Sequence, residues 1–465
     1  MLPTLDSEDS VGTPVAPAKR EVPSLVTDAR ERHRNMRGKL NLFQAMVLRW
    51  RDMHPYVAVH MVSVAHPLEP ARLKESIAER LEAAGLARIA LDRRRKRFEF
   101  RGGPAMVNLA VLQGGEEPGV VGRAEIERQL NAAFPDEGTF TPFRFFAIDA
   151  GAIFQLGLAY DHFIAGGDSI AVLLEWLVDG YVPGTRQTAA GWAPRRYPRT
   201  YRRLFLSHLG DSLRGLVRLP SMIASCRRSS RAPCGSKGPA TNGFVSFRVC
   251  EGELAALLRT AKDWRVTMND LVLAMLLRSL AAVVPRQDDR RRSELGVASI
   301  VNLRGEFESD ARDTFGLFLA SLRVSHPVPA GIELKRLASD VHAETDRVKR
   351  EKLFLQTLVA LGWSALAWRF LDPSQRRRFL AKHYPIWAGV TSLNIDSLWK
   401  ERPASHPPLE YTRAVPTGPL APIALAITTF RGAMQVGVSY RIADVSADLA
   451  ARVAEGFLAE IHALV

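Results

Sequence analysis

The chain has 465 residues, of which 47% are hydrophobic and 24% are charged, and its formal net charge at pH 7 is +14. This balance is typical of globular domains with sizeable cores, and it excludes a disordered or fibrous chain as a whole. The three cysteines form no CxxC pair, so neither a disulfide framework nor a zinc site is predicted and a reducing, cytoplasmic location is expected. The excess of positive charge indicates an anionic partner.

The N-terminal 38 residues mix Pro, Ser, Ala and charged residues without an apolar core, so residues 1–38 are predicted to be a disordered leader. They contain no apolar segment typical of a signal peptide. The apolar, uncharged run at residues 353–368 is shorter than the roughly 20 residues that a membrane span requires. We therefore expect a buried core helix there.

Residues 39–182 are predicted to form a first half in which strands and helices alternate, as in a mixed sheet covered by helices. Runs of β-branched and aromatic residues predict strands at 56–64, 98–100, 107–112, 143–148 and 153–158. Apolar residues at helical spacing predict helices at 40–51, 73–81, 121–134 and 170–178. The basic cluster at 93–97 is interpreted as a solvated hairpin, with a phosphate contact as the alternative.

Residues 183–240 are predicted to be a basic linker between the two halves. From 184 to 239 the sequence has twelve Lys or Arg residues against the single Asp211. Within it, Phe205, Leu209 and Leu213 share one helical face flanked by arginines. Two interpretations remain open: a crossover helix packed on the domain surface, or a basic amphipathic helix that docks on an anionic membrane surface.

Residues 241–465 are predicted to form a second half that again combines a sheet with helices. Strands are expected at 244–249, 296–303, 315–324, 388–394, 423–429 and 436–440. Helices are expected at 251–264 and 271–284, in several segments up to about residue 384, and at 449–461. Thr267 is predicted to be the N-cap of the second helix, with Asp270 as its capping partner.

Residues 159–169, AYDHFIAGGDS, join a predicted strand to a predicted helix and place His162 where the strand ends. Imidazole titrates near neutral pH, so a histidine at a sheet edge is suited to act as a general base. Gly166 and Gly167 allow a substrate or another backbone to come close to it. The alternative is a structural histidine that donates to a backbone carbonyl.

This stretch resembles the HHxxxDG signature of the chloramphenicol acetyltransferase-like superfamily, which includes condensation domains and wax ester synthase/diacylglycerol acyltransferases. His162 matches the catalytic second His and Gly167 the closing Gly, while Asp161 stands at the first His and Gly166 at the family aspartate. Residues 266–274 (VTMNDLVLA) and 299–304 (SIVNLR), followed by 315–318 (FGLF), resemble motifs of the wax ester synthase branch.

The resemblance implies an α/β (α+β) fold of two chloramphenicol acetyltransferase-like sandwich halves with a tunnel between them. It also implies that His162 is the base for acyl transfer from a thioester. Residues of the loop and of the second half are expected to contact substrate: Gly166, Gly167, Ser169, Thr391, Ser392 and Asn394. Oxyanion stabilisation is expected from Thr391, Ser392 or Asn394.

Two aspartates flank the histidine in this sequence. Asp161 is expected to point away from the ring, because neighbouring side chains of an extended chain face opposite sides. Asp168 is expected either to replace the family aspartate, by accepting from an arginine, or to cap the following helix, which is the preferred interpretation.

The predicted function is an acyltransferase that forms an ester on a hydroxyl acceptor, with acyl-CoA or acyl-carrier protein as co-substrate and no bound cofactor or metal. The expected partners are the thioester donor, a small-molecule or lipid acceptor, an acidic carrier protein and an anionic membrane surface at its inner face, but no nucleic acid. Two alternatives remain: an amide-forming condensation enzyme acting on carrier proteins, and a degenerate family member that serves as a binding or scaffold protein.

Overall fold

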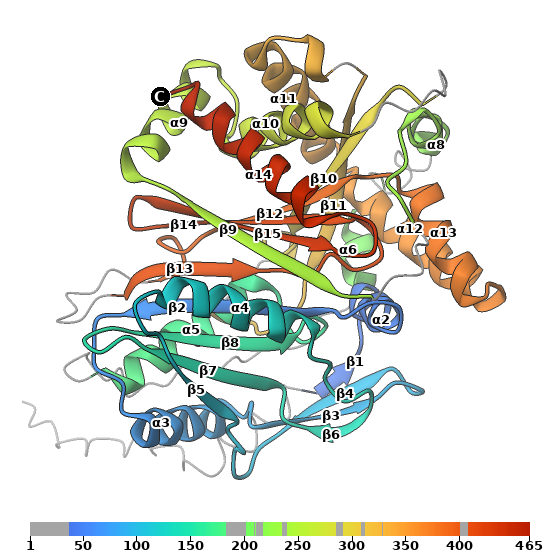
Figure 1. Cartoon of the computed structure of the whole chain (residues 1–465). Helices are drawn as coiled ribbons and strands as arrows, with labels where there is room; N and C mark the ends of the chain where they lie inside the picture. Colours follow the sequence, from blue (N-terminus) through green and yellow to red (C-terminus); the bar gives the residue numbers. More distant parts are fainter. Residues whose placement is uncertain are drawn as a thin grey trace, which may run out of the picture.

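The computed structural model describes residues 37–182, 201–208, 210, 217–234, 240–284, 292–307, 312–327, 329–399 and 408–465. The chain has an α/β fold with two halves, each containing a mixed sheet covered by helices (Figure 1). In Figure 1 the N-terminal half, in blue and teal, lies below the C-terminal half, in yellow to red.

The N-terminal half contains two sheets where the sequence predicted one. A five-stranded sheet has the order β13-β2-β8-β7-β5, and a smaller four-stranded sheet has the order β1-β4-β3-β6. Its elements are β1 Arg37–Lys39, α2 Leu42–Arg51, β2 Val57–Val64, α3 Pro70–Ala83, β3 Arg88–Asp92, β4 Arg97–Arg101, β5 Leu109–Gln113, α4 Pro118–Asn131, β6 Gly138–Phe140, β7 Phe143–Asp149, β8 Phe154–Asp161 and α5 Gly167–Tyr181.

The small sheet corrects one prediction and confirms another. The prediction of a disordered leader is wrong for its last two residues, because β1 pairs with β4 from Arg37 to Lys39; residues 1–36 lie outside the described part. The basic cluster does form a hairpin, since β3 and β4 are antiparallel. Its turn places Lys96 in the left-handed region, at φ 53°.

The linker contains two described helices, α6 Tyr201–Ser207 and α8 Leu219–Arg228. Helix α6 packs on the core through the buried Tyr201 and Leu204, and Phe205 is half-buried against the same core. Packing on the domain surface therefore accounts for this part of the segment. Leu209 and Leu213 lie outside the described residues.

The C-terminal half is built on a six-stranded sheet of order β11-β10-β12-β14-β15-β9, in which β12 is parallel to both of its neighbours. Its elements are β9 Asn242–Val249, α9 Glu251–Asp263, α10 Met268–Val283, β10 Leu295–Asn302, η1 Gly305–Phe307, β11 Leu319–His326, η2 Pro329–Gly331, α11 Leu334–Arg350, α12 Phe354–Ala367, η3 Trp368–Phe370, α13 Pro373–His383, β12 Ala388–Asn394, β13 Pro408–Ala414, β14 Ile423–Phe430, β15 Ala433–Arg441 and α14 Ala447–His462. Thr267 caps α10 in a capping box with Asp270, as predicted.

Strand β13 was not predicted, and it joins the two halves. In the sequence it lies between β12 and β14 of the C-terminal sheet, but it pairs antiparallel with β2, with Arg413 opposite His60. In Figure 1 it lies between β2 below and β14 above. Helix α4 makes a second link, because it contacts β2 of its own half and β9 of the other. One hydrophobic core consequently extends through both halves.

Helix α12 covers most of the apolar run at 353–368. The prediction of a buried helix is right for its inner face, where Phe354, Leu355 and Leu358 are buried, and wrong for its outer face. On the outer face the exposed fraction is 67% for Trp363 and 47% for Leu366. Among the described residues no single helix has the length and apolarity to cross a membrane, although two sharply bent helix pairs do when their members are taken together.

Candidate active site

His162 lies in the turn directly after β8, as the sequence predicted. Its backbone N–H donates to the carbonyl of Tyr56 over 3.0 Å, which ties the end of β8 to the chain just before β2. The Tyr56 ring stacks on the imidazole with centroids 5.7 Å apart, and Tyr160 meets it edge-on at 5.8 Å. Two aromatic side chains therefore limit how the imidazole can rotate.

The hydrogen bonds of the ring determine its tautomer. Nδ1 lies 3.2 Å from the carbonyl oxygen of Ala165, which can only accept a hydrogen bond, so Nδ1 carries the proton. Burial lowers the pKa of His162 from 6.5 to about 4. The ring is therefore neutral at pH 7, and the lone pair of Nε2 is left to accept a proton.

Asp161 does not contact the imidazole, in agreement with the expectation from strand geometry. Its fully buried carboxylate pairs with Arg51 at the end of α2, and Arg51 also binds Asp136 at 2.7 Å. Burial raises the pKa of Asp161, and the charge of Arg51 opposes this rise. The residue at the first motif position therefore fastens the loop to α2.

Asp168 is held by an arginine, and the preferred interpretation as a helix cap is wrong. Helix α5 begins at Gly167 after the N-cap Gly166 and has no side-chain cap. The carboxylate of Asp168 instead pairs with Arg304 and accepts from Nδ2 of Asn302 over 2.8 Å. Both partners belong to the VNLR motif of the other half, for which the sequence suggested no role.

Gly166 and Ser169 were expected to contact substrate, but neither lines the cavity described below. The N–H of Gly166 donates to the carbonyl of Gly316 over 2.9 Å. Ser169 is fully buried, and its hydroxyl accepts from the N–H of Gly316 over 3.1 Å and from Arg304. These two residues attach the loop to the C-terminal half.

A cavity of about 800 Å³ lies between the two halves, and His162 lines it. The N-terminal half contributes Phe43, Trp50, Tyr56, His60, Tyr160, His162, Gly167 and Asp168 to its wall. The C-terminal half contributes residues of β10 to β14 and of α11, α12 and α13, and helix α8 of the linker also lines the cavity. A space of this size accommodates a small organic ligand.

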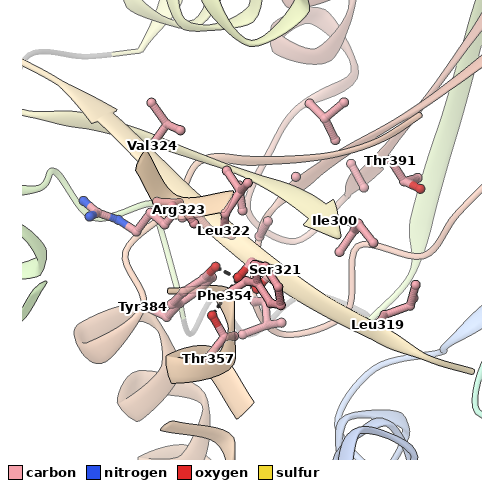
Figure 2. A pocket seen from close by; sticks show the side chains of 18 of the residues that line it. Ile300, Leu319, Ser321, Leu322, Arg323, Val324, Phe354, Thr357, Tyr384 and Thr391 are labelled. Atoms are coloured by element: carbon pink, nitrogen blue, oxygen red, sulfur yellow. Dashed lines mark hydrogen bonds between the residues drawn. The ribbon is translucent and has the colours of Figure 1, made fainter. Parts of the chain in front are cut away.

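The wall from the C-terminal half combines apolar side chains with polar and charged ones. Figure 2 shows Ile300, Leu319 and Phe354 around this part of the cavity, with Thr391 of β12 at its edge. Ser321 and Tyr384 share a hydrogen bond of 2.9 Å there. Of the three predicted β12 residues, Thr391 and Ser392 line the cavity, whereas Asn394 does not.

Two lining residues near His162 were missed by the sequence analysis, His60 of β2 and Arg413 of β13. His60 is fully buried, and its Nδ1 lies 2.7 Å from the hydroxyl of Tyr411. Arg413 is 2% exposed and reaches the cavity from the unpredicted strand. A histidine inside an apolar strand and an arginine in a polar stretch carry no sequence signal that distinguishes them from ordinary residues.

Comparison with known proteins gives likenesses of fold. No family model and no curated protein matches the chain. The first condensation domain of the calcium-dependent antibiotic synthetase is similar over 92% of this chain and 96% of its own, with a TM-score of 0.64 and 15% identity. Trichothecene 15-O-acetyltransferase from Fusarium sporotrichioides is similar over 92% and 95%, with a TM-score of 0.67 and 14% identity.

The epimerization domain from the third module of tyrocidine synthetase B is also similar, with a TM-score of 0.60, 12% identity, and coverage of 92% of this chain and 96% of that one. At these identities the likeness concerns the fold. Because it spans nearly the whole of each chain, the chain has the fold shared by condensation domains of peptide synthetases and chloramphenicol acetyltransferase-like acyltransferases.

Proposed function

We propose that the protein is an acyltransferase that moves an acyl group from a thioester to a hydroxyl acceptor, with His162 as the general base. One observation carries the proposal: a neutral imidazole, with Nδ1 bonded to the Ala165 carbonyl, lines a cavity that both halves of the fold enclose. In this geometry Nε2 can take the proton of the attacking hydroxyl as the new ester bond forms.

The environment of His162 argues against a protein that only binds or scaffolds. A degenerate site would be expected to turn the imidazole into the core or to fill the cavity with side chains. Here the ring lines an open cavity, and buried ion pairs to Arg51 and Arg304 hold the loop at both ends. Such preorganisation favours catalysis because the base is already in place when the substrates bind.

The thioester is proposed to be that of CoA or of an acyl-carrier protein. Condensation domains and an O-acetyltransferase share this fold, which supports transfer of an acyl group without selecting between these donors. The resemblance of the VNLR and TMND segments to the wax ester synthase branch favours ester formation. Amide formation on a carrier protein is the second candidate, favoured by the condensation domains among the similar structures.

Replacement of His162 with alanine tests the proposal. The purified protein is assayed with acetyl-CoA, octanoyl-CoA and octanoyl-carrier protein against an alcohol and an amine of matched length, and release of the free thiol is followed. His162→Ala is expected to lower kcat/KM about 100- to 10,000-fold, the usual contribution of a general base. A higher rate with the amine than with the alcohol would favour the condensation candidate.

The control is His462→Ala, because His462 is exposed on α14 and pairs with Glu253 of α9. This variant should retain wild-type kcat/KM. Circular dichroism and thermal unfolding must show that His162→Ala is folded. Wild-type turnover by a folded His162→Ala protein would remove His162 as the base.

A further inference from the structure

Arg413 is a buried cation that neutral groups hold in place. Its Nε donates to the hydroxyl of Thr428 over 2.8 Å, and its Nη2 donates to the carbonyls of Thr391 and Ile427 over 3.0 and 2.7 Å. Three such hydrogen bonds fix the guanidinium plane. The side chain is therefore rigid before any ligand binds.

Within the described residues no carboxylate forms an ion pair with Arg413. The carboxylate of Asp168 also lines the cavity, but Arg304 and Asn302 hold it. Burial lowers the pKa of Arg413 to about 10, which leaves it charged at neutral pH. The charge of Asp168 favours the protonated form of Arg413 without pairing with it directly. A buried charge without a paired counter-ion is costly, so an anionic ligand in the cavity would stabilise this arrangement.

The free side of the guanidinium faces the start of α5. Among the described residues Nη1 of Arg413 donates to no acceptor, and it lies 3.0 Å from the place that a Cβ on Gly167 would take. Helix α5 starts at Gly167 and has no side-chain cap, so the positive end of its dipole lies at this point.

His60 faces the same point from β2, the strand that pairs with β13. Its Nε2 lies 3.5 Å from that Cβ position, and this buried atom has no hydrogen-bond partner. Burial keeps the pKa of His60 well below its usual value, so the ring is neutral. When the hydroxyl of Tyr411 donates to Nδ1 over 2.7 Å, the proton of the neutral ring is on Nε2, which is then a donor.

We infer that Arg413, His60 and the N-terminus of α5 at Gly167 form a subsite for a carboxylate carried by the acyl acceptor. This inference rests on the proposed function, which it makes more specific: the acceptor is a hydroxy acid with an apolar body. The carboxylate binds Arg413, the hydroxyl lies at Nε2 of His162, and the apolar body extends along the wall formed by Ile300, Leu319 and Phe354 (Figure 2).

Binding of a matched pair of ligands, without any donor, tests the subsite. Isothermal titration calorimetry compares 3-hydroxyoctanoate with its methyl ester, which lacks the negative charge and is larger by one methyl group. A hydrogen-bonded charge pair that is shielded from solvent predicts that wild type binds the acid about 10- to 100-fold more tightly. Equal affinities for acid and ester in wild type would overturn the inference.

Two variants locate the effect. Arg413→Gln should bind acid and ester equally, whereas His162→Ala should keep the preference for the acid. The second result separates the subsite from the proposed function, because it needs no acyl transfer. If thermal unfolding shows that Arg413→Gln is not folded, Arg413→Lys replaces it and is expected to lose most of the preference, because a lysine cannot make the three hydrogen bonds that hold the guanidinium in place.

An oxyanion-stabilising role for Arg413 would give a different pattern. In that case Arg413→Lys lowers kcat equally for the acid and the ester as acceptors and leaves their relative affinities unchanged. That outcome contradicts a carboxylate subsite. A rise in KM for the acid alone, with kcat retained, supports it.

Discussion

Asp161 and Asp168 stand at the two ends of the loop that carries His162, and each is buried against an arginine from a different part of the chain. Asp161 pairs with Arg51 of α2, which belongs to the same half as the loop. Asp168 pairs with Arg304, which lies 136 residues later in the other half. Arg51 has a second carboxylate, that of Asp136, at 2.7 Å.

The loop is therefore attached to both halves and not to one. Its first residue follows the position of α2, and its last residues follow the C-terminal half through Arg304 and Gly316. The cavity lies between these halves, so the position of His162 relative to the cavity depends on how the halves sit together. The cross-half pair should therefore matter more to activity than the local one.

The largest effect is expected from Asp168→Ala. Removing this carboxylate takes the paired negative charge away from the buried Arg304, and breaking a buried pair in this way costs about 3–5 kcal/mol of unfolding free energy. Loss of the link between loop and C-terminal half should also lower kcat/KM for the acyl transfer assay. Denaturant unfolding and initial rates measure the two effects.

The double variant Asp168→Ala/Arg304→Met is the control for the charge. It also removes the positive charge that was paired with Asp168, so it should recover part of the unfolding free energy lost in Asp168→Ala. A folded Asp168→Ala protein with wild-type stability and rate would show that the cross-half pair does not position the loop.

The pH dependence of kcat/KM tests whether either aspartate contacts the imidazole of His162. Burial lowers the pKa of His162 to about 4, whereas direct contact with a carboxylate would raise it above 6.5. Because the base must be neutral, kcat/KM should stay constant as pH falls from 7 and decline only near pH 4. Return to pH 7 before a second assay checks that the enzyme has not unfolded.

The lowered pKa of His162 also makes the stability of the folded protein depend on pH. A histidine whose pKa is lowered in the folded state binds a proton more readily when unfolded, so stability decreases as pH falls from about 6.5 toward 4. An acid limb of kcat/KM with a midpoint at or above pH 6.5 would mean that a carboxylate does reach the imidazole. Asp161 would then be the first candidate for that contact.

Much of the local structure around the site was predictable, because it depends on patterns within about ten residues. The change from an apolar strand to small residues and then to an apolar helix placed His162 correctly after β8 and before α5. The capping box of Thr267 and Asp270 was equally visible, since its two residues are three apart. At the loop ends, the arginine contact of Asp168 was one of two interpretations and not the preferred one, and the pairing of Asp161 with Arg51 was not predicted.

What the sequence could not predict are contacts between residues far apart in the chain. Strand β13 contains Pro408, Glu410 and Arg413, which are poor indicators of a strand, and it pairs with the edge of β2, which is more than 340 residues earlier in the chain. Arg304 likewise gains its meaning from Asp168 in the other half. Periodicity reports which face of an element is buried, but it does not report what lies opposite a buried polar group.

Asp270 is a third buried aspartate, and it tests whether a buried aspartate that is not paired with an arginine affects activity. Asp270 accepts from Thr267 and Thr345, both at 2.6 Å, and His342 Nδ1 lies 2.7 Å away; no arginine bonds it among the described residues. Burial alone would raise the pKa of Asp270, but these hydrogen bonds lower it. Thr267→Ala should cost about 1 kcal/mol of stability, as for other lost caps, and should leave kcat/KM unchanged. A change in rate would assign the α10 terminus to the active site.

The smallest effect is expected from Asp161→Asn. The asparagine side-chain oxygen can still accept from the N–H of Phe163, as the carboxylate does over 3.4 Å, and from Arg51. Arg51 keeps its bond to Asp136, so no charge is stranded, and the change in unfolding free energy should be below about 1 kcal/mol at pH 7.

The difference in unfolding free energy between Asp161→Asn and wild type should depend on pH. Burial raises the pKa of Asp161 above the usual 3.8, so the folded state holds that proton more tightly than the unfolded state does. Wild-type stability should therefore decrease as pH rises through the raised pKa of Asp161. The asparagine variant does not titrate, so its stability has no such dependence. Relative to wild type, the variant should become more stable as pH rises from about 4 to 7, measured by urea unfolding at each pH. A variant that instead loses about 3 kcal/mol, by a deficit that grows with pH, would show that the Arg51 pair holds the loop as firmly as the Arg304 pair does.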